Sequence, residues 1–303
     1  MSEESSSSDF RCGTAAIVGR PNVGKSTLVN ALVGARLSIV GPKPQTTRHR
    51  ILGIVTREQG QILLLDTPGL HAGGARAINR QLNRAARNAA SEADVCVQLI
   101  EAGRWTDEDQ LVRNVLSDSP RPRLLAINKV DAQKDKKQLL PFMQQVATDG
   151  FYAAVCLISA QKRDGIDTLE REIIARLPVG AAQFSEEEFT DRSERFLAAE
   201  LIREQLMLRL AQELPYSTTV EIEQFSERED GVAEIHAVIW VEREGQKAIV
   251  IGKGGEQLKA IGSAARVAMN RLFDRRVFLK LWVKVRENWS DDEAALQRFG
   301  YAE

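Results

Sequence analysis

The stretch that decides the fold is Gly19-Arg20-Pro21-Asn22-Val23-Gly24-Lys25-Ser26. It fits G-x-x-x-x-G-K-[ST], the pattern of a loop that cradles phosphates through its backbone N–H groups. The apolar run 14–18 before it predicts a buried strand, and residues 27–33 after it predict a helix. These flanks disfavour the alternative, a glycine turn that binds nothing. The sequence therefore predicts a strand–loop–helix unit in which Lys25 reaches the β- and γ-phosphates of a nucleotide and Ser26 coordinates Mg²⁺.

The composition is that of an ordinary globular protein of about two domains. The chain has 303 residues, of which 43% are hydrophobic and 27% are charged. No apolar run reaches the roughly 20 residues that a membrane-spanning helix needs. The acidic, serine-rich residues 1–12 predict a disordered tail and not a secretory signal. Because Cys12, Cys96 and Cys156 show no metal-binding spacing, we expect reduced, structural thiols in a cytoplasmic protein.

Apolar runs and amphipathic segments alternate over residues 14–177. Strands are expected at 14–18, 51–57, 61–66, 94–100, 123–127 and 151–158, and helices at 27–33, 73–91, 105–116, 136–146 and 166–177. We expect Pro141 to interrupt or kink the helix 136–146. The alternation predicts an α/β fold with a doubly wound, mostly parallel sheet, in which 51–57 and 61–66 form a hairpin. Ligands bind such sheets at the carboxyl ends of the strands.

Two further loops predict a response to the γ-phosphate, one between the first helix and the strand 51–57 and the other at the carboxyl end of the strand 61–66. In the polar loop 41–50, Thr47, or alternatively Thr46, is expected to coordinate Mg²⁺ and to sense the γ-phosphate. Asp66 ends an apolar strand and can hold Mg²⁺ through a water molecule. The Gly69 N–H can then meet the γ-phosphate.

The segment Asn128-Lys129-Val130-Asp131 predicts the choice of base. The Asp131 carboxylate can accept hydrogen bonds from guanine N1–H and from its exocyclic amino group, and adenine offers neither in that geometry. Asn128 can contact the other edge of the base, the Lys129 stem can cover its face, and the Ala160 N–H can donate to guanine O6. Wrong bases would leave buried polar groups unpaired, so we expect strong selection for guanine.

Residues 193–289 predict a second, α+β domain in the order α-β-β-α-α-β. Its elements are expected at 193–214, 217–225, 232–241, 246–251, 256–273 and 277–285. The G-x-x-G segment 252–255 lies between two helices, an arrangement that can clamp a nucleic-acid backbone. Residues 246–286 carry ten Lys or Arg against two acids, which by charge alone fits a nucleic-acid footprint and a solvated surface equally. The G-x-x-G segment inside this block, in this order of elements, favours RNA as the ligand. The residues expected to bind RNA are Ile251, Gly252, Lys253, Gly254, Gly255 and Lys259. Trp282 and Trp289 are expected to pack in the fold and not to stack on bases.

Residues 13–178 resemble the GTPase domain of the Era branch of the TrmE-Era-EngA-like GTPases. The resemblance is carried by the form of 19–26, by Gln45-Thr46-Thr47-Arg48 and by Asp66-Thr67-Pro68-Gly69-Leu70. Residues 193–289 resemble a type II KH domain. The domain plan expected is a tail (1–12), a GTPase domain (13–180), a linker (181–192), a KH domain (193–289) and a C-terminal tail (290–303).

This resemblance implies a bacterial GTPase that binds 16S rRNA near its 3′ end and assists maturation of the 30S ribosomal subunit. GTP or GDP would gate RNA engagement. A monomer in the cytoplasm is expected, and the family also implies peripheral association with the inner membrane, for which the sequence shows no membrane element. One rival is an RNA-binding chaperone whose nucleotide domain is a static scaffold. A related GTPase of tRNA modification is disfavoured, since those proteins carry a C-terminal cysteine and the last cysteine here is Cys156.

The resemblance also bears on catalysis. Many GTPases orient water with a glutamine at the position of Leu70, and leucine cannot do so, which predicts slow unaided hydrolysis. Asn22 either holds a potassium ion beside the phosphates, as in relatives, or only shapes the loop. The catalytic residues expected are Lys25, Thr47 and Asn22, and the Mg²⁺ ligands are Ser26, Thr47 and, through water, Asp66. The residues expected to bind GTP are Gly19, Arg20, Pro21, Asn22, Val23, Gly24, Lys25, Ser26, Thr27, Asp66, Thr67, Pro68, Gly69, Leu70, Asn128, Lys129, Val130, Asp131, Ser159 and Ala160.

Overall fold

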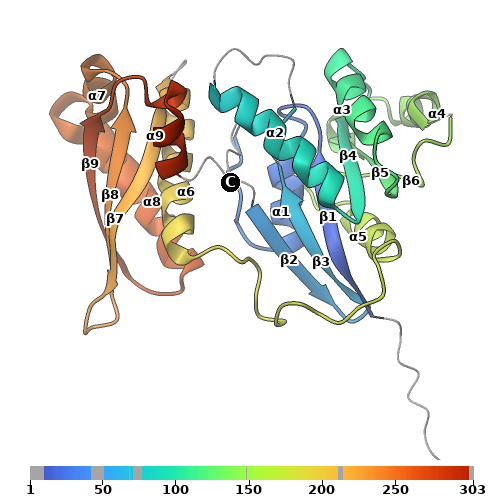
Figure 1. Ribbon diagram of the computed structural model, residues 1–303, viewed down its shortest axis with the longest axis horizontal. Helices are drawn as coiled ribbons and strands as arrows, with labels where there is room; N and C mark the ends of the chain where they lie inside the picture. The colour runs from blue at the N-terminus through green and yellow to red at the C-terminus, as the bar shows by residue number, and fades with distance from the viewer. Residues whose placement is uncertain are drawn as a thin grey trace, which may run out of the picture. The chain divides into compact units, whose positions relative to one another are not determined.

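The computed structural model describes residues 10–41, 51–67, 69–70, 77–147, 149–210 and 214–299. The chain divides into two compact units, and the last of the boundaries between them falls between Asp191 and Arg192 (Figure 1). Pro68, Thr46 and Thr47 lie outside the described residues, as does most of the predicted N-terminal tail. Each unit is built on a single sheet.

The first unit contains a six-stranded sheet in the order β2-β3-β1-β4-β5-β6. Its strands are β1 (Arg11–Val18), β2 (Ile51–Arg57), β3 (Gly60–Asp66), β4 (Val95–Glu101), β5 (Arg123–Asn128) and β6 (Ala154–Leu157). Only β2 runs antiparallel to its neighbour, and all other pairs are parallel. This confirms the predicted α/β class and the hairpin.

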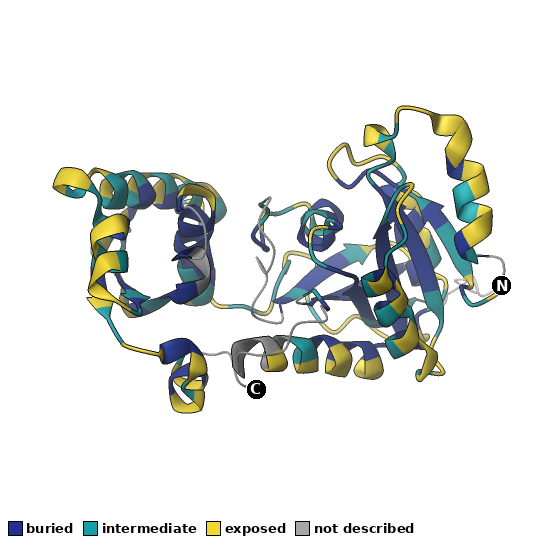
Figure 2. Ribbon diagram, turned by 90° about the horizontal axis from the view of Figure 1, so that it is seen from above, coloured by how far each residue is buried: buried dark blue, intermediate teal, exposed yellow. Residues whose placement is uncertain are grey.

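Helices cover both faces of this sheet. They are α1 (Lys25–Val33), α2 (Ala77–Glu92), α3 (Asp107–Ser117), α4 (Leu139–Ala147) and α5 (Ile166–Ile174). Successive side chains of a strand point to opposite faces. Accordingly, Ala15 and Ile17 of β1 join the core under α1 and α5, whereas Ala16 and Val18 join the core under α2 and α3. Figure 2 shows the strands almost wholly buried and the helices buried along one side.

Of the two expected effects near Pro141, the structure shows an interruption of the helix. The expected helix 136–146 is divided into a 3-10 turn, Lys136–Gln138, and helix α4, which begins at Leu139. Pro141 therefore lies in the first turn of α4, where the missing N–H removes no helical hydrogen bond.

The segment after α5 lies along the β2–β3 hairpin. The buried Gln61 side chain accepts hydrogen bonds from the N–H groups of Gln183 and Phe184 and donates to the Phe184 carbonyl, at 2.8–3.0 Å. Farther along, the Ile54 N–H donates to the Phe189 carbonyl, and the Thr190 hydroxyl donates to Leu52. The segment that the sequence marks as a linker is thus hydrogen-bonded to β2 and β3.

The second unit has a three-stranded sheet in the order β7-β8-β9. Its elements are α6 (Glu194–Arg209), β7 (Thr218–Glu227), β8 (Ala233–Val241), α7 (Glu244–Ile251), α8 (Glu256–Leu272), β9 (Val277–Val285) and α9 (Glu293–Arg298). Helices α6, α7 and α8 pack on the face of the sheet that carries Ala237 and Ile239. β7 pairs antiparallel with β8, and β8 pairs parallel with β9. The predicted order α-β-β-α-α-β is confirmed. The short helix α9 was not predicted from the sequence.

None of the described helices is long and apolar enough to cross a membrane. The three cysteines are buried and free, as expected of structural thiols. Burial raises the pKa of the Cys96 thiol to about 11, so this group is a poor nucleophile at neutral pH.

Candidate nucleotide and RNA sites

The phosphate loop (residues 19–26) joins β1 to α1, and its glycines are required by close contacts. Gly24 has φ 100°, and a Cβ there would lie 2.4 Å from the Asn128 amide nitrogen. A Cβ at Gly19 would lie 2.6 Å from the Leu99 carbonyl oxygen. Asn22 is exposed and also has a positive φ of 63°, which asparagine tolerates better than most residues. The backbone of the loop can therefore approach a ligand closely.

Lys25 is buried at the centre of the loop. Its Nζ donates to the carbonyl oxygens of Gly19 and Arg20 at 3.1 and 3.0 Å. Burial lowers the pKa of the Lys25 ammonium to about 8, and the nearby Asp66 carboxylate opposes this shift. A phosphate ligand would supply the negative charge that favours the protonated form.

The residues after β3 lie against the phosphate loop. A Cβ at Gly69 would be 3.1 Å from Lys25 Nζ and 3.0 Å from the Pro21 nitrogen, so only glycine fits without a shift. The Leu70 N–H donates to the Gly19 carbonyl, and the Leu70 side chain is buried in the core. Leucine at this position therefore cannot orient water, as the sequence indicated.

The oxygens expected to hold Mg²⁺ have the appropriate chemistry. Asp66 is fully buried at the carboxyl end of β3, and Ser26 is buried in the first turn of α1. Carboxylate and hydroxyl oxygens are the hard ligands that Mg²⁺ prefers. Thr67 differs, because its hydroxyl donates to the Ile17 carbonyl at 2.8 Å and so joins β3 to β1.

Asn128 joins three loops. Its amide nitrogen donates to the Val23 carbonyl at 2.8 Å, and its amide oxygen accepts from the Ala160 N–H at 2.9 Å. Both ends of the side chain are thus engaged by the protein, whereas the sequence suggested contacts of Asn128 and Ala160 with the base. Those base contacts stay predictions, and they require these groups to share their hydrogen bonds.

Asp131 is exposed to solvent, and its carboxylate is fixed by a hydrogen bond. The Ser159 hydroxyl donates to Asp131 Oδ1 at 2.6 Å and lowers the pKa of the Asp131 carboxyl. Lys129, two residues before, has φ 63° and is the N-cap residue of the 3-10 turn Val130–Ala132. The base loop (residues 128–131) and the loop at Ser159 therefore lie together, and an ionised acceptor faces outward between them.

Glu101 was missed by the sequence reading. It ends β4, and its carboxylate contacts Arg20 of the phosphate loop and Lys129 of the base loop. The signal was available, because an acid that ends an apolar parallel strand is the same pattern that identified Asp66.

The glycine loop (residues 252–255) connects α7 to α8 in the second unit. Gly252 has φ 74° and ψ 175°, a conformation that is essentially restricted to glycine. Gly254 and Gly255 also have positive φ values, of 61° and 82°. Lys253 is exposed beside them. The loop offers exposed backbone and one cation at the N-terminus of α8, which suits a phosphodiester.

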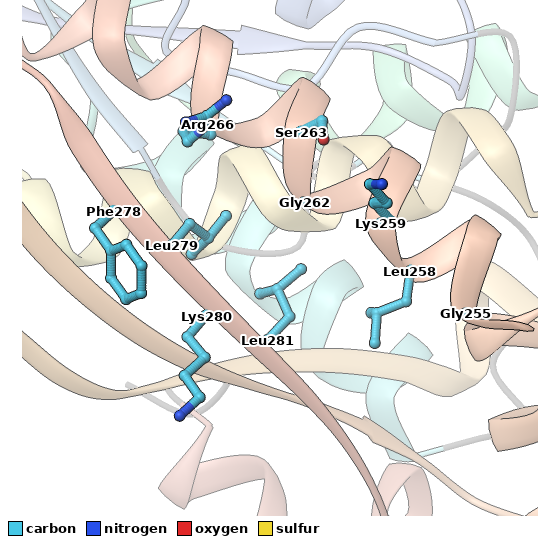
Figure 3. Close-up of a pocket in the computed structure, with 10 residues that line it drawn as sticks. All are labelled: Gly255, Leu258, Lys259, Gly262, Ser263, Arg266, Phe278, Leu279, Lys280 and Leu281. Atoms are coloured by element: carbon cyan, nitrogen blue, oxygen red, sulfur yellow. The ribbon is translucent and has the colours of Figure 1, made fainter.

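A groove of about 460 Å³ runs beside this loop between α8 and β9 (Figure 3). It is lined by Gly255, Leu258, Lys259, Gly262, Ser263, Arg266, Phe278, Leu279, Lys280 and Leu281. The leucines provide an apolar surface, and Lys259 and Arg266 border it from α8, whereas the Lys280 side chain points away from α8 (Figure 3). Arg266 and Lys280 were not predicted, although Arg266 follows Lys259 by seven positions, which places both on one side of a helix. The groove can hold unpaired bases with their phosphates near cations.

The basic block 246–286 is less positive than its composition suggests. Half of its ten cations pair with acids: Lys247 with Glu244, Arg275 with Glu194 and Glu227, Arg276 with Asp230, Lys284 with Glu223 and Arg286 with Asp292. In the described part of the chain, Lys253, Lys259, Arg266, Arg271 and Lys280 have no acidic partner. Four of these five belong to the glycine loop or the groove, where positive charge remains available.

The two tryptophans pack as expected. Trp289 is fully buried, and its Nε1 donates to the Ser217 carbonyl at 3.2 Å. Trp282 is partly buried, lies edge-on to His236, and has Lys280 Nζ 4.9 Å from its ring centroid.

The comparisons with known proteins agree with these features. Residues 14–129 match the family model of the 50S ribosome-binding GTPases, and residues 213–290 match that of the KH domain. GTPase Era of Stenotrophomonas maltophilia (strain R551-3) is 58% identical over 301 residues, which cover 99% of this chain and 100% of that protein. GTPase Era of Xanthomonas oryzae pv. oryzae (strain MAFF 311018) is 59% identical over 295 residues, which cover 97% and 98% of the two chains.

Two solved structures match nearly the whole chain. One is a crystal structure of Era in complex with MgGDPNP and nucleotides 1506–1542 of 16S ribosomal RNA, and the other is Aquifex aeolicus Era bound to GDP·AlF4⁻. Each has a TM-score of 0.93 at 36% identity, covering 97% of this chain and 100% of the other. Given this agreement over both units, the chain belongs to the Era family of GTPases.

Proposed function

We propose that this GTPase binds 16S rRNA near its 3′ end, assists maturation of the 30S subunit, and engages RNA according to its nucleotide state. Residues 13–180 would bind and hydrolyse GTP, 193–289 would bind RNA, and 181–192 would connect them. The observation that carries the proposal is the meeting of loops 19–26, 69–70, 128–131 and 159–160 at one edge of a sheet, in a chain that also has a glycine loop beside a basic groove. The Era–16S rRNA complex supports the choice of RNA.

Hydrolysis would proceed by in-line attack of water on the γ-phosphate. Lys25 and the loop N–H groups would stabilise charge on the transferring phosphoryl group, and Asp131 would hold the guanine. Mg²⁺, when bound, neutralises charge on the β- and γ-phosphates, and Ser26, Thr47 and, through water, Asp66 would hold it.

The proposal includes a monomer in the cytoplasm with peripheral association to the inner membrane. These three properties rest on the resemblance to the family and on no contact described above.

Lys25→Ala distinguishes a nucleotide-gated factor from an RNA chaperone with a static nucleotide domain. We expect hydrolysis to fall about 100-fold, because one positioned cation at the phosphates is lost. We also expect the variant to fail to restore 30S assembly in cells depleted of the protein. Lys137→Ala, at an exposed lysine of the same unit, should behave as the parent protein. Full restoration of assembly by Lys25→Ala would favour the chaperone.

Asn22 is tested by exchanging potassium for sodium. We expect GTP hydrolysis to be at least about tenfold faster in KCl than in NaCl at equal ionic strength, since a held cation replaces part of an arginine finger. Asn22→Gly keeps the positive φ and removes only the side chain, so this variant should lose the potassium effect and keep GDP affinity. Equal rates of the parent protein in both salts would show that Asn22 only shapes the loop.

A further inference from the structure

Glu101 lies between the phosphate loop and the base loop. It is the last residue of β4 and pairs in register with Asn128 of β5. Its Oε2 accepts a hydrogen bond from the Arg20 guanidinium at 3.0 Å, and its Oε1 lies 3.2 Å from Lys129 Nζ. One carboxylate therefore contacts a cation of the phosphate loop with one oxygen and a cation of the base loop with the other.

Arg20 is fixed on its other side as well. Its side chain is 7% exposed, and its Nε donates to Asp109 Oδ2 at 3.2 Å. The same oxygen accepts from the N–H and the hydroxyl of Thr106, which form the capping box of α3. Gln98 donates to the Asp109 carbonyl at 2.8 Å. Arg20 is thus held by Asp109, a fully buried residue in the first turn of α3, and Glu101 adds the connection toward the base loop.

The contacts continue from Arg20 to Lys25 through the backbone carbonyl of Arg20. The Arg20 carbonyl oxygen accepts from Lys25 Nζ at 3.0 Å, so the placement of Arg20 affects the placement of the lysine. A continuous path of contacts runs from Lys129 through Glu101 and Arg20 to Lys25. Coupling between sites is carried by such contiguous contacts when the groups in them are rigidly held.

Glu101 is ionised at neutral pH. Burial acts to raise the pKa of the Glu101 carboxyl, but the hydrogen bonds and charges of Arg20 and Lys129 outweigh it and lower the pKa. Removing this charge would leave Arg20, which is nearly fully buried, with Asp109 as its remaining acid in the described part of the chain. A buried cation that loses one of its partners shifts position or draws in water.

We propose that Glu101 is a positioning residue that couples the phosphate loop to the base loop, through Arg20 on one side and Lys129 on the other. The inference rests on the proposed nucleotide site, because Lys129 must cover the base for the coupling to reach guanine. Because of this coupling, the position of the base loop against the guanine and the position of the phosphate loop against the phosphates depend on each other. In this role Glu101 acts through Arg20 and Lys129 and not by its own contact with the nucleotide.

A double-mutant cycle on the full chain tests this coupling. GDP affinity is measured for the parent protein, Glu101→Gln, Lys129→Met and the double variant. We expect each single change to weaken binding about tenfold and the double variant to be weakened by no more than about twofold beyond the worse single, because both changes break the same connection. A purely structural role of Glu101 would give effects that multiply.

Glu170→Gln is the matched control. Glu170 pairs with Arg57 at 2.8 Å and its side chain is 12% exposed, but the pair joins α5 to β2 and has no contact with the phosphate or base loops. We expect Glu170→Gln to lower the melting temperature as Glu101→Gln does, to leave GDP affinity within about twofold, and to combine multiplicatively with Lys129→Met. If Glu101→Gln does not fold, Glu101→Asp serves in the cycle, since the shorter side chain keeps the charge but cannot span both cations.

The outcomes separate the inference from the proposed site. If Lys129→Met weakens GDP binding and the effects of Glu101→Gln and Lys129→Met multiply in the double variant, the coupling is overturned. The proposed nucleotide site would still stand in that case. No effect of Lys129→Met would show that the Lys129 ammonium does not contribute to GDP binding. It would overturn the coupling and leave the cover of the base by the apolar stem, which methionine keeps, unaffected.

Discussion

Asp131→Asn lowers the affinity for GDP about 10³-fold and makes xanthosine diphosphate the preferred nucleotide, because two hydrogen bonds to a charged acceptor contribute roughly 1.5–3 kcal/mol each. The Ser159 hydroxyl donates to Asp131 Oδ1. In the variant the amide oxygen would take that place, and the amide NH₂ would face the base. Guanine presents its own amino group there, so donor would meet donor. Xanthine presents a carbonyl oxygen at the same position and would accept.

The measurement is a displacement titration with GDP, xanthosine diphosphate and ADP at fixed Mg²⁺ and salt. Asp135→Asn is a suitable control, because Asp135 is an exposed acid that caps the neighbouring 3-10 turn, Lys136–Gln138, and lies outside the base loop. It should leave all three affinities unchanged. GDP affinity of Asp131→Asn within about threefold of the parent value would contradict the role of Asp131, since even one charged hydrogen bond contributes more.

The double change Lys253→Asp and Gly254→Asp lowers the affinity for single-stranded RNA about 10³-fold, because it places negative charge where a phosphodiester must lie. The structure indicates that this variant folds. A Cβ at Gly254 would meet no atom within 4 Å, and aspartate tolerates its φ of 61°. Gly252 would be a poor choice, since a Cβ there would lie 2.7 Å from the Gln257 Cβ.

The second unit offers a control with the same chemistry. Arg276→Asp with Gly231→Asp also replaces a cation and a positive-φ glycine, and a Cβ at Gly231 meets nothing within 4 Å. Arg276 follows the end of α8 opposite to the glycine loop. Fluorescence anisotropy with an RNA of the 16S 3′ sequence, at fixed salt, should show weak binding only for the glycine-loop variant. GDP affinity should be unchanged in both, and equal RNA affinity of the two variants would reject the glycine loop as the RNA site.

The fold could be predicted because the residues that specify each helix, strand and loop lie close together in the sequence. Strand 14–18, the phosphate loop and helix 27–33 follow from periodicity and glycine chemistry within a short window. The rule that ligands meet parallel sheets at carboxyl strand ends then brought Asp66 and Asp131 together without knowledge of the register.

What the sequence did not reveal depends on pairings between distant residues. The contact of Arg20 with Glu101 spans 81 positions, and the tie of Asn128 to Val23 spans 105, so both require the strand order of the sheet. The charge of the basic block was overestimated for the same reason, since Glu194, Glu223 and other acids that neutralise it come from outside the block. Helix α9 was missed because its six residues are too few to show a period, and burial of Leu296 is what holds it.

Residues 189–190 also cover part of one edge of the first sheet. β2 is an edge strand, and an uncovered edge strand can pair with a strand of another molecule and start aggregation. Here the Ile54 N–H is taken by the Phe189 carbonyl, and Gly53 is bridged by Thr190. The segment that leads toward the second unit therefore covers the middle of β2 at residues 52–54, so that its hydrogen bonds reduce the exposed edge available for pairing with another molecule as well as supporting the fold.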